Sequence, residues 1–580
     1  METVNIKING MPLTVPKNYT ILEAARSAGI DIPTLCYLKE INEIGACRIC
    51  VVEVKGARSL VTACVYPVNE GMEVFTNSPA VLKSRKLTLE LILSTHERKC
   101  LSCVRSGSCE LQKLCYEYQV DDETYFEGEK HHYEIDDSAL HMYRDNNKCI
   151  LCRRCVAACS KLQGIGVIDA NERGFNTHIG CAFEKDLADT SCVSCGQCIV
   201  ACPTGALSEK DDTQPVWDAL HDPSKHVVVH TAPSIRATLG EAFGNPVGTN
   251  VKGKMVAALR RLGFDKVFDT DFGADLTIME EANEFIERVQ NGGKLPMITS
   301  CSPGWVKFCE HYYPDLLDNM SSCKSPQQMS GAIIKTYYAQ KMGIDPKDIF
   351  CVSIMPCTAK KFEVQRDFQD AAGVPDVDVA LTTRELARMI NRAGILFNEL
   401  PDEEFDSPLG DSTGAAAIFG ATGGVMEAAL RTAVETLTGK ELEKPDFMEV
   451  RGTADIKEAT YNVAGMDVNV AVVSGLANAR KLLDDVKAGK KNYHFIEVMA
   501  CPGGCVNGGG QPTQPASVRN FVDLKAKRAA ALYEEDKDLP LRKSHESPVI
   551  KTLYDEFLEK PGSHKAHEIL HTKYVARSIY

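Results

Sequence analysis

Two cysteine runs in the first 210 residues have the spacing of iron ligands. CILCRRCVAACS occupies residues 149–160 and CVSCGQCIVACP occupies 192–203, so each run reads CxxCxxCxxxC, and a proline follows the last cysteine of the second. Thiolates at this spacing bind two 4Fe-4S clusters, with the fourth cysteine of each run on the other cluster. We therefore predict one cluster on Cys149, Cys152, Cys155 and Cys202 and a second on Cys192, Cys195, Cys198 and Cys159.

Two more groups of potential ligands precede these runs. They are Cys36, Cys47, Cys50 and Cys64, and then His96, Cys100, Cys103 and Cys109. The first group suits one 2Fe-2S cluster wrapped by a loop, as in plant-type ferredoxins, although the spacing is not the usual CxxxxCxxC; zinc is the alternative. The second group could hold zinc on spacing alone, but iron-sulfur sites on both sides favour a further 4Fe-4S cluster. Cys115 is expected to be a spare buried thiol.

Further cysteines follow apolar runs in the second half of the chain. The segments are KLPMITSCSPGW, IFCVSIMPCTAKKFE and YHFIEVMACPGGC, which carry Cys301, Cys357, Cys501 and Cys505. Glycines in the stretch 503–510 remove side chains around the last two thiols and are predicted to let the backbone approach a bulky inorganic group. Lys360 adds a cation where thiolates need charge compensation. These features predict a catalytic metal centre rather than another relay.

The elements that must position these groups can be read from periodicity. Residues 4–15 alternate around an Asn9-Gly10 turn, which indicates a hairpin, and Thr20 with Glu23 predicts a capping box at the start of a helix. From about residue 225, apolar runs alternate with charged helical segments, as in an α/β domain. Open α/β folds place ligands at the carboxyl ends of strands, which is where the cysteine loops lie.

Composition excludes several classes of protein. The net charge of −14 disfavours nucleic acid as a partner. METVNIKING lacks a basic segment followed by an apolar run, and no window approaches the roughly 18 apolar residues of a membrane span. We expect a cytoplasmic, soluble protein in which the 24 cysteines serve metal rather than disulfides.

Three motifs together resemble those of iron-iron (FeFe) hydrogenases. TSCSPGW, MPCTAKKFE (355–363) and EVMACPGGCVNGG (497–509) are similar to the family's H-cluster motifs, and colinearity extends over nearly the whole chain, including the HEILH-containing tail. The resemblance implies reversible oxidation of H2 to two protons and two electrons. It also implies an H-cluster, in which a 4Fe-4S cubane is joined through a cysteine sulfur to a diiron unit carrying CO, cyanide and azadithiolate.

The resemblance assigns roles to residues of this sequence. Cys357, Cys501 and Cys505 would ligate the cubane, with Cys505 as the bridging sulfur. Lys360 would bind a cyanide, and the diiron unit would be lined by Met355, Met499, Pro233, Ser234 and Gln327.

A proton route is expected along one helix. Glu281, Glu284 and Arg288 are spaced so that a helix puts them on one face, which on its own indicates a solvated charge ladder. The resemblance favours instead a relay through Glu281, Glu284, Ser321 and a cysteine.

TSCSPGW departs from the family, in which two adjacent cysteines are usual. By register with MPC, Cys301 falls on the proton-relaying cysteine and Ser302 on a cubane ligand, but a serine oxygen is a poorer iron ligand than a thiolate. Either Ser302 ligates, or Cys301 ligates and Ser302 relays protons; ligand chemistry favours the second. Cys181, Cys309, Cys323 and Cys351 carry no motif and are expected to be buried thiols.

The expected organisation is a multidomain α+β and α/β protein, with ferredoxin-like iron-sulfur domains followed by a large α/β H-cluster domain. The boundaries are a 2Fe-2S domain at 1–79, a His/Cys3 4Fe-4S segment at 80–138, a two-cluster domain at 139–210 and the catalytic domain with its tail at 211–580. No GxGxxG follows a strand, so use of NAD(P) requires another subunit.

Several partners and functions follow from the resemblance. We expect the catalytic subunit of an NAD(P)-linked complex, in some cases electron-bifurcating, with flavin-containing partner subunits and with maturation proteins for the cofactor. A stand-alone ferredoxin-dependent hydrogenase is the alternative. A pure electron-transfer subunit does not explain the three C-terminal motifs, and an assembly or sensory relative does not require Lys360 or the relay glutamates.

Overall fold

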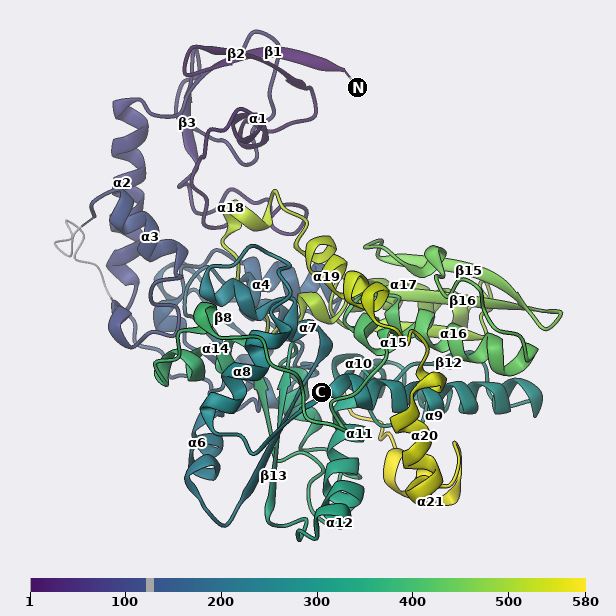
Figure 1. Ribbon diagram of the computed structural model, residues 1–580. Coiled ribbons are helices and arrows are strands. Elements are labelled where there is room, and N and C mark those ends of the chain that lie inside the picture. Colours follow the sequence, from purple (N-terminus) through teal and green to yellow (C-terminus); the bar gives the residue numbers. More distant parts are fainter. Residues whose placement is uncertain (1, 121–129, 580) are drawn as a thin grey trace.

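The N-terminal unit is a small sheet that wraps one helix. The computed structural model describes residues 2–120 and 130–579 (Figure 1). The sheet has the order β2-β1-β5-β3-β4, and α1 (Ile21–Ser27) packs against it. The strands are β1 (Thr3–Ile8), β2 (Met11–Pro16), β3 (Val51–Val54), β4 (Val61–Thr62) and β5 (Glu73–Phe75).

Local sequence accounts for this unit as expected. The Asn9-Gly10 turn has φ of 51° and 83°, the left-handed values that a tight hairpin requires. The Thr20 side chain accepts from the Glu23 amide, and the Glu23 carboxylate accepts from the Thr20 amide, so the predicted capping box is confirmed.

Two helices connect this unit to the rest of the molecule. They are α2 (Pro79–Thr95), which begins at the N-cap Ser78, and α3 (Glu110–Glu117), and they lie together beside the N-terminal sheet (Figure 1). The buried Arg85 of α2 donates to the Val51 carbonyl oxygen of β3 over 2.8 Å, which fixes α2 to the sheet.

The next segment contains two short helices, one in each cysteine run. They are α4 (Arg154–Ala157) and α5 (Gln197–Ala201). Two small antiparallel sheets accompany them, formed by β6 (Met142–Arg144) with β9 (Leu207–Glu209) and by β7 (Asp169–Asn171) with β8 (His178–Gly180). The internal repeat in sequence is thus a repeat in structure.

The part of the chain from residue 226 onwards, called the catalytic part below, is built on two four-stranded sheets. One is entirely parallel, in the order β11-β10-β13-β14; the other has the order β12-β17-β16-β15, in which only the β15–β16 pair is antiparallel. The strands are β10 (His226–Thr231), β11 (Lys266–Asp269), β12 (Met297–Ile298), β13 (Ile349–Met355), β14 (Val379–Thr382), β15 (Ile456–Val463), β16 (Met466–Ser474) and β17 (Phe495–Met499).

Helices cover these sheets and bury their apolar strands, as expected where parallel strands are buried on both faces. In chain order they are α6 (Thr213–His221), α7 (Pro233–Arg236), α8 (Lys252–Leu262), α9 (Thr270–Gln290), α10 (Pro303–Tyr312), α11 (Pro326–Ile333), α12 (Ala339–Met342), α13 (Ala359–Glu363), α14 (Thr383–Arg392), α15 (Gly414–Ala417), α16 (Gly424–Thr438) and α17 (Leu476–Lys487). The expected multidomain class, with iron-sulfur domains ahead of an α/β domain, is confirmed.

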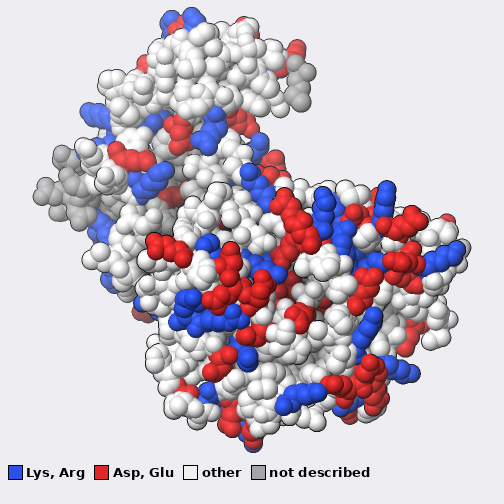
Figure 2. All heavy atoms as spheres, viewed as in Figure 1, with Lys and Arg blue, Asp and Glu red and all other residues white. Residues whose placement is uncertain are grey.

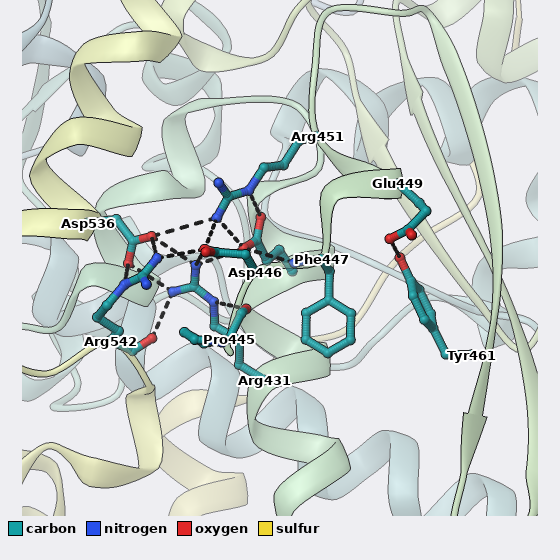
Figure 3. Close-up of polar contacts among 10 residues, drawn as sticks. Arg431, Pro445, Asp446, Phe447, Glu449, Arg451, Tyr461, Asp536 and Arg542 are labelled. Carbon is teal, nitrogen blue, oxygen red and sulfur yellow. Dashed lines mark hydrogen bonds and ion pairs between the residues drawn. The ribbon is translucent and has the colours of Figure 1, made fainter. Parts of the chain in front are cut away.

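The C-terminal segment crosses the catalytic part as a series of helices. These are α18 (Ala516–Arg519), α19 (Leu524–Asp538), α20 (Pro548–Leu553) and α21 (His564–Leu570), drawn in yellow tones in Figure 1. A network of ion pairs attaches α19 to α16 (Figure 3). Arg431 and Asp536 are both fully buried and meet through two hydrogen bonds of 2.9 and 2.8 Å, while Arg542 and Arg451 complete the network.

Acidic and basic side chains are interspersed over the face shown in Figure 2, so this face carries no continuous basic surface. Within residues 2–120 and 130–579, every helix is too short or too polar to cross a membrane.

Candidate active site

Loops from both sheets of the catalytic part converge on one cavity. Its walls come from the carboxyl ends of β10, β12, β13 and β17, where an open α/β fold places ligands. The lining includes all nine residues that the resemblance assigned to the H-cluster pocket, together with the two residues left open: Pro233, Ser234, Gln327, Met355, Cys357, Lys360, Met499, Cys501, Cys505, Cys301 and Ser302.

Three thiols meet in this cavity. The side chains of Cys357 and Cys501 hydrogen bond to each other. Cys505 lies close enough to Cys357 for the charge of Cys357 to raise its pKa. Burial raises the pKa of Cys505 to about 12, so the thiol stays protonated unless a cation binds. Soft sulfur donors in an enclosed pocket are the ligand set of an iron-sulfur cluster, so these residues fit one.

The two residues of the departing motif point to different neighbours. Cys301 lies beside Glu281 and Cys505. Burial is the main cause that raises the pKa of Cys301 well above the usual value, and the charges of these two neighbours raise it further. The Oγ of Ser302 accepts from the Ala500 amide over 3.2 Å, one residue before Cys501. Ser302 is the N-cap residue of α10, but its side chain makes no capping hydrogen bond. Both residues line the cavity.

Lys360 is held in place by three acceptors. Its Nζ donates to the Glu363 carboxylate at 2.8 Å, to the Ser325 hydroxyl at 2.9 Å and to the Cys301 carbonyl oxygen at 3.2 Å. Glu363 also accepts from Gln327 at 2.9 Å, so one buried carboxylate orients two cavity residues. No role was predicted for Glu363, although its i,i+3 spacing from Lys360 within MPCTAKKFE was an available signal if this segment is helical.

A second buried carboxylate was also missed. Glu497 of β17 accepts from the amides of Gly423 and Met426, both at 2.7 Å. It thereby holds the loop after Phe419 and Gly420, which form another wall of the cavity. The glycine pair in GATGGV was the available signal, since Gly423 has a φ of 94° that favours glycine.

Two glycines of 503–510 are packed closely against neighbouring loops. A Cβ on Gly504 would come within 2.7 Å of the Thr422 amide, and one on Gly509 within 2.1 Å of the Cys195 carbonyl oxygen. These two glycines therefore allow loops to pack against one another. Gly504 and Gly508 also line the cavity that contains Cys501 and Cys505, where the approach of backbone to an inorganic group stays a prediction.

The predicted proton-relay residues lie together on and beside α9. Glu281 is fully buried. Its carboxylate oxygens lack a close hydrogen-bond partner among the described residues, but the Ser321 hydroxyl and the Ser300 backbone lie near enough to favour the charged form. Burial, and secondly the charge of Glu284, raise the pKa of Glu281 to about 8. Ser321 donates to Glu284 over 2.9 Å, and Arg288 pairs with Glu284 at 2.5 Å. A fully buried Glu281 does not belong to a solvated charge ladder.

The cysteines of the two CxxCxxCxxxC runs gather as the crossed pattern predicts. One cavity is lined by Cys149, Cys152, Cys155 and Cys202, and another by Cys159, Cys192, Cys195 and Cys198. Each donor set therefore fits one 4Fe-4S cluster. The second cavity adjoins the active site. Thr358 donates to the Ser194 carbonyl oxygen over 2.7 Å, and Cys195 lies close enough to Cys501 for its charge to raise the pKa of Cys501.

The two N-terminal groups also come together, to different extents. The Sγ atoms of Cys50 and Cys64 are 3.3 Å apart, and Cys36 hydrogen bonds to Cys47 and Cys64. In the second group, Cys103 lies close enough to Cys109 for its charge to raise the pKa of Cys109. The buried Nδ1 of His96 has no hydrogen-bond partner among the described residues, which leaves it free to ligate.

The thiols without a motif are placed nearly as expected. Cys181, Cys309, Cys323 and Cys351 are buried, whereas Cys115 is only partly buried. Cys115 differs because it lies on α3, and α3 buries only Leu111 and Leu114 fully.

The α/β domain contains a buried cavity lined by thiols, and further thiol-lined cavities lie on the N-terminal side of it. This arrangement defines an iron-sulfur oxidoreductase with a metal active site. Comparison with known proteins identifies its family. Residues 225–509 match the family described as "Iron only hydrogenase large subunit, C-terminal domain", and residues 522–577 match "Iron hydrogenase small subunit". Upstream, residues 1–79 match a 2Fe-2S binding domain, 85–124 the NADH-ubiquinone oxidoreductase-G iron-sulfur binding region and 148–206 a 4Fe-4S dicluster domain.

Two curated relatives match over almost their whole length. The chain is 52% identical to "NADP-reducing hydrogenase subunit HndD" of Solidesulfovibrio fructosivorans, with all of both chains covered, and 48% identical to "Iron hydrogenase 1" of Clostridium pasteurianum, with 98% of this chain and 99% of that one covered. Among solved structures, that of HydA(deltaEFG) aligns with a TM-score of 0.56 at 43% identity, covering 63% of this chain and 98% of the other.

The chain belongs to the FeFe hydrogenases. It is an oxidoreductase that interconverts H2 with protons and electrons, and its cofactors are 2Fe-2S and 4Fe-4S clusters and the H-cluster. The family resemblance predicted from three motifs is thus confirmed.

Proposed function

We propose that this hydrogenase is the hydrogen-converting subunit of an NAD(P)-linked hetero-oligomer. The carrying observation is the full-length likeness, at 52% identity, to a chain named as a subunit of an NADP-reducing hydrogenase. Partner subunits bearing flavin would exchange electrons with the pyridine nucleotide, because this sequence has no GxGxxG after a strand. A cytoplasmic location fits that supply of nucleotide.

The N-terminal residues would hold the electron relay. The proposed division is 1–79, 80–138, 139–210 and 211–580, of which the second part includes 121–129, outside the described residues. The 2Fe-2S cluster would sit on the four thiols around Cys50, the next cluster on His96 and three thiols, and the last two on the crossed cysteine sets. The contact of Ser194 with Thr358 makes the 192–198 cluster the one nearest the active site.

Cys357, Cys501 and Cys505 would hold the cubane of the H-cluster, with Cys505 also binding the diiron unit. When bound, the H-cluster supplies the iron at which H2 is split or formed. Lys360 would present a cation fixed by Glu363 to a cyanide ligand. Pro233, Ser234, Gln327, Met355 and Met499 would exclude water from the cavity.

The contacts favour Cys301 as the proton-relaying residue and Ser302 as the residue at the cubane corner, the arrangement that ligand chemistry alone disfavours. Among the nearby charges, that of Glu281 raises the pKa of the Cys301 thiol the most, whereas Ser302 contacts Ala500, one residue before a cubane cysteine. The Ser302 hydroxyl oxygen would take the position of the missing thiolate.

Protons would then move between four side chains of this chain. The Cys301 thiol exchanges its proton with the Glu281 carboxylate, and the Ser321 hydroxyl lies near that carboxylate on the side towards Glu284. The Ser321 hydroxyl connects towards Glu284, which it meets at 2.9 Å, and Arg288 holds Glu284 in position. A carboxyl with a pKa of about 8 gains and loses protons readily near neutral pH.

Copurification tests the electron partner. A tagged chain expressed at its natural level should bring down flavin-containing subunits, and the isolated assembly should reduce NADP or NAD with H2. A homogeneous single chain that exchanges electrons with ferredoxin and ignores pyridine nucleotide would overturn the proposed complex and favour the stand-alone enzyme.

Two matched variants test the thiol and the hydroxyl. Cys301→Ala should lose turnover while the infrared bands of the H-cluster remain, and Ser302→Ala should instead perturb or lose the cubane signal. The reverse pair of results would make Cys301 the ligand.

A further inference from the structure

Three side chains beside the proton route bring metal-ligating atoms together. Glu284 on α9, Cys323 in the loop before α11 and His571 after α21 place a carboxylate oxygen, a sulfur and a ring nitrogen all within 4.8 Å of one another. The three residues come from segments far apart in the sequence. None of the roles given above uses Cys323 or His571.

Backbone pairing holds the C-terminal tail against this loop. The Lys324 amide donates to the Leu570 carbonyl oxygen and the Thr572 amide donates to that of Ser322, both over 2.8 Å. Cys323 and His571 therefore form an antiparallel bridge. Because the tail is paired here, the imidazole of His571 is fixed opposite the thiol of Cys323.

The charges around Cys323 favour a cation. Burial is the main cause that raises the pKa of this thiol. The negative charges of three nearby carboxylates raise it further, those of Glu284, Glu281 and Glu280. Among the described residues, Arg288 is the guanidinium paired with Glu284. Three carboxylates around one guanidinium leave excess negative charge, which protons or a divalent cation can offset.

The donor types select the class of metal. A thiolate, an imidazole and a carboxylate suit zinc and similar thiophilic cations, whereas Mg²⁺ and Ca²⁺ prefer oxygen ligands. His571 is also supported as a ligand would be. Its Nε2 lies 3.2 Å from Glu280 and its Nδ1 lies 2.8 Å from the Ser322 hydroxyl, so a metal on Nδ1 would replace the contact with Ser322 and keep that with Glu280. A carboxylate behind an imidazole is the usual outer shell of a zinc site.

One of the three donors is partly open to solvent. The Glu284 side chain is 15% exposed, and the ring of the exposed His567 lies beside that of His571 at a centroid distance of 4.0 Å. A cation can therefore approach the site from the side of Glu284.

We propose that Glu284, Cys323 and His571 form a binding site for a thiophilic divalent cation such as Zn²⁺, and that binding blocks proton transfer through Glu284. As the metal–sulfur bond forms, the thiol releases one proton to solvent and no electron is transferred. The cation occupies the carboxylate that otherwise accepts from Ser321. The blocking step rests on the proton route proposed above; the binding site does not.

Zinc titration of the anaerobic holoenzyme tests both parts. After gel filtration, X-ray absorption at the zinc edge should report one bound Zn²⁺ per chain with sulfur, nitrogen and oxygen neighbours. Hydrogen turnover should fall in proportion to occupancy, while the infrared bands of the H-cluster and the EPR signals of the relay stay unchanged. Mg²⁺ at the same concentration should do neither.

Variants separate the site from other zinc-binding positions. Cys323→Ala and His571→Asn should each weaken zinc binding and inhibition by at least the roughly 10- to 100-fold that loss of a supporting group costs. Cys309→Ala removes another buried thiol and should leave both unchanged. Retained H-cluster bands confirm that each variant has folded.

The failures are distinguishable. Equal zinc affinity in Cys323→Ala, His571→Asn and the parent enzyme would overturn the site. Zinc bound through these residues without inhibition would overturn the block, and normal turnover of Glu284→Gln would then show that the proton route itself is wrong.

Discussion

The relay and the catalytic part of this hydrogenase assemble their sulfur ligands in opposite ways. In the two crossed 4Fe-4S sets of the relay, three thiols lie within seven residues, and only the fourth comes from the partner run. In the catalytic part, Cys357 and the pair Cys501 and Cys505 follow strands of two different sheets. Relay sites are thus encoded by local spacing, whereas the active site depends on the strand order of a whole domain.

This difference predicts where damage spreads. A lost relay ligand should affect one cluster and the electron flow through it, while a lost ligand at the convergence point should remove the chemistry and leave the relay intact. The predictions below test that contrast, beginning with the largest effect.

Cys505→Ala should abolish hydrogen evolution and uptake. The residue is proposed to join the cubane to the diiron unit, and alanine offers no donor atom. EPR of the reduced protein should still show the N-terminal clusters. Retained hydrogen evolution would rule out the bridging role.

Glu281→Gln should lower turnover by about 10²- to 10⁴-fold, the usual contribution of a positioned proton donor. The H-cluster infrared bands should persist, because only proton transfer is lost. In the parent enzyme, proton delivery should decline above about pH 8, where Glu281 loses its proton, and the variant should lack this step. An unchanged rate and pH profile would show that protons take another path.

The same group gives a stability test with a defined sign. The folded pKa of about 8 lies above that of an unfolded glutamate near about 4.3, so the unfolded chain binds fewer protons between these values. Glu281 therefore lowers stability as pH rises from about 4 to about 8. Glu281→Gln should gain stability relative to the parent over that range, measured by thermal unfolding under nitrogen.

Cys159→Ala should separate the two regions most directly. The cluster at 192–198 should be lost or altered, so turnover with a soluble dye should fall. Exchange of deuterium from D2 with solvent protons should continue, because this reaction needs no electrons from outside. Loss of that exchange together with the H-cluster bands would show that the two regions do not assemble independently.

Arg431→Met tests the attachment of the C-terminal segment. Arg431 pairs with the buried carboxylates of Glu427 and Asp536, and its removal leaves them only the partly exposed Arg451 and Arg542, at a cost of up to about 3–5 kcal/mol in unfolding free energy. Lys55→Met removes an exposed pair with Glu73 in the relay and should leave the melting temperature unchanged. Equal effects of the two substitutions would contradict the buried network shown in Figure 3.

Much of the fold and site could be predicted from sequence because the signals were local or matched a known family. The Asn9-Gly10 turn, the capping box at Thr20, the crossed cysteine runs and the helix bearing Glu281 each depend on spacing along a few residues. All nine pocket residues taken from the family resemblance line the cavity.

The remainder depends on contacts between distant segments, which spacing does not encode. Glu497 accepts from the Gly423 loop, and Glu363 accepts from Ser325 and Gln327, contacts that no periodicity predicts. The pair of Glu363 with Lys360 is different, because its i,i+3 spacing is a local signal. Gly504 and Gly509 are packed against backbone of Thr422 and Cys195, contacts that the spacing of the glycines does not show. The cluster of Glu284, Cys323 and His571 likewise requires the tail to pair with loop 321–325.

The attachment of the C-terminal segment has a consequence for how the protein can be encoded. Residues 522–577 match a family described as a small subunit, yet here they follow the catalytic domain on the same chain. The Arg431–Asp536 pair and the tail pairing at Cys323 therefore act as a subunit interface whose two sides are tethered by a short linker. Tethering keeps the effective concentration of the segment high, so the interface does not need the affinity that a separate polypeptide would require.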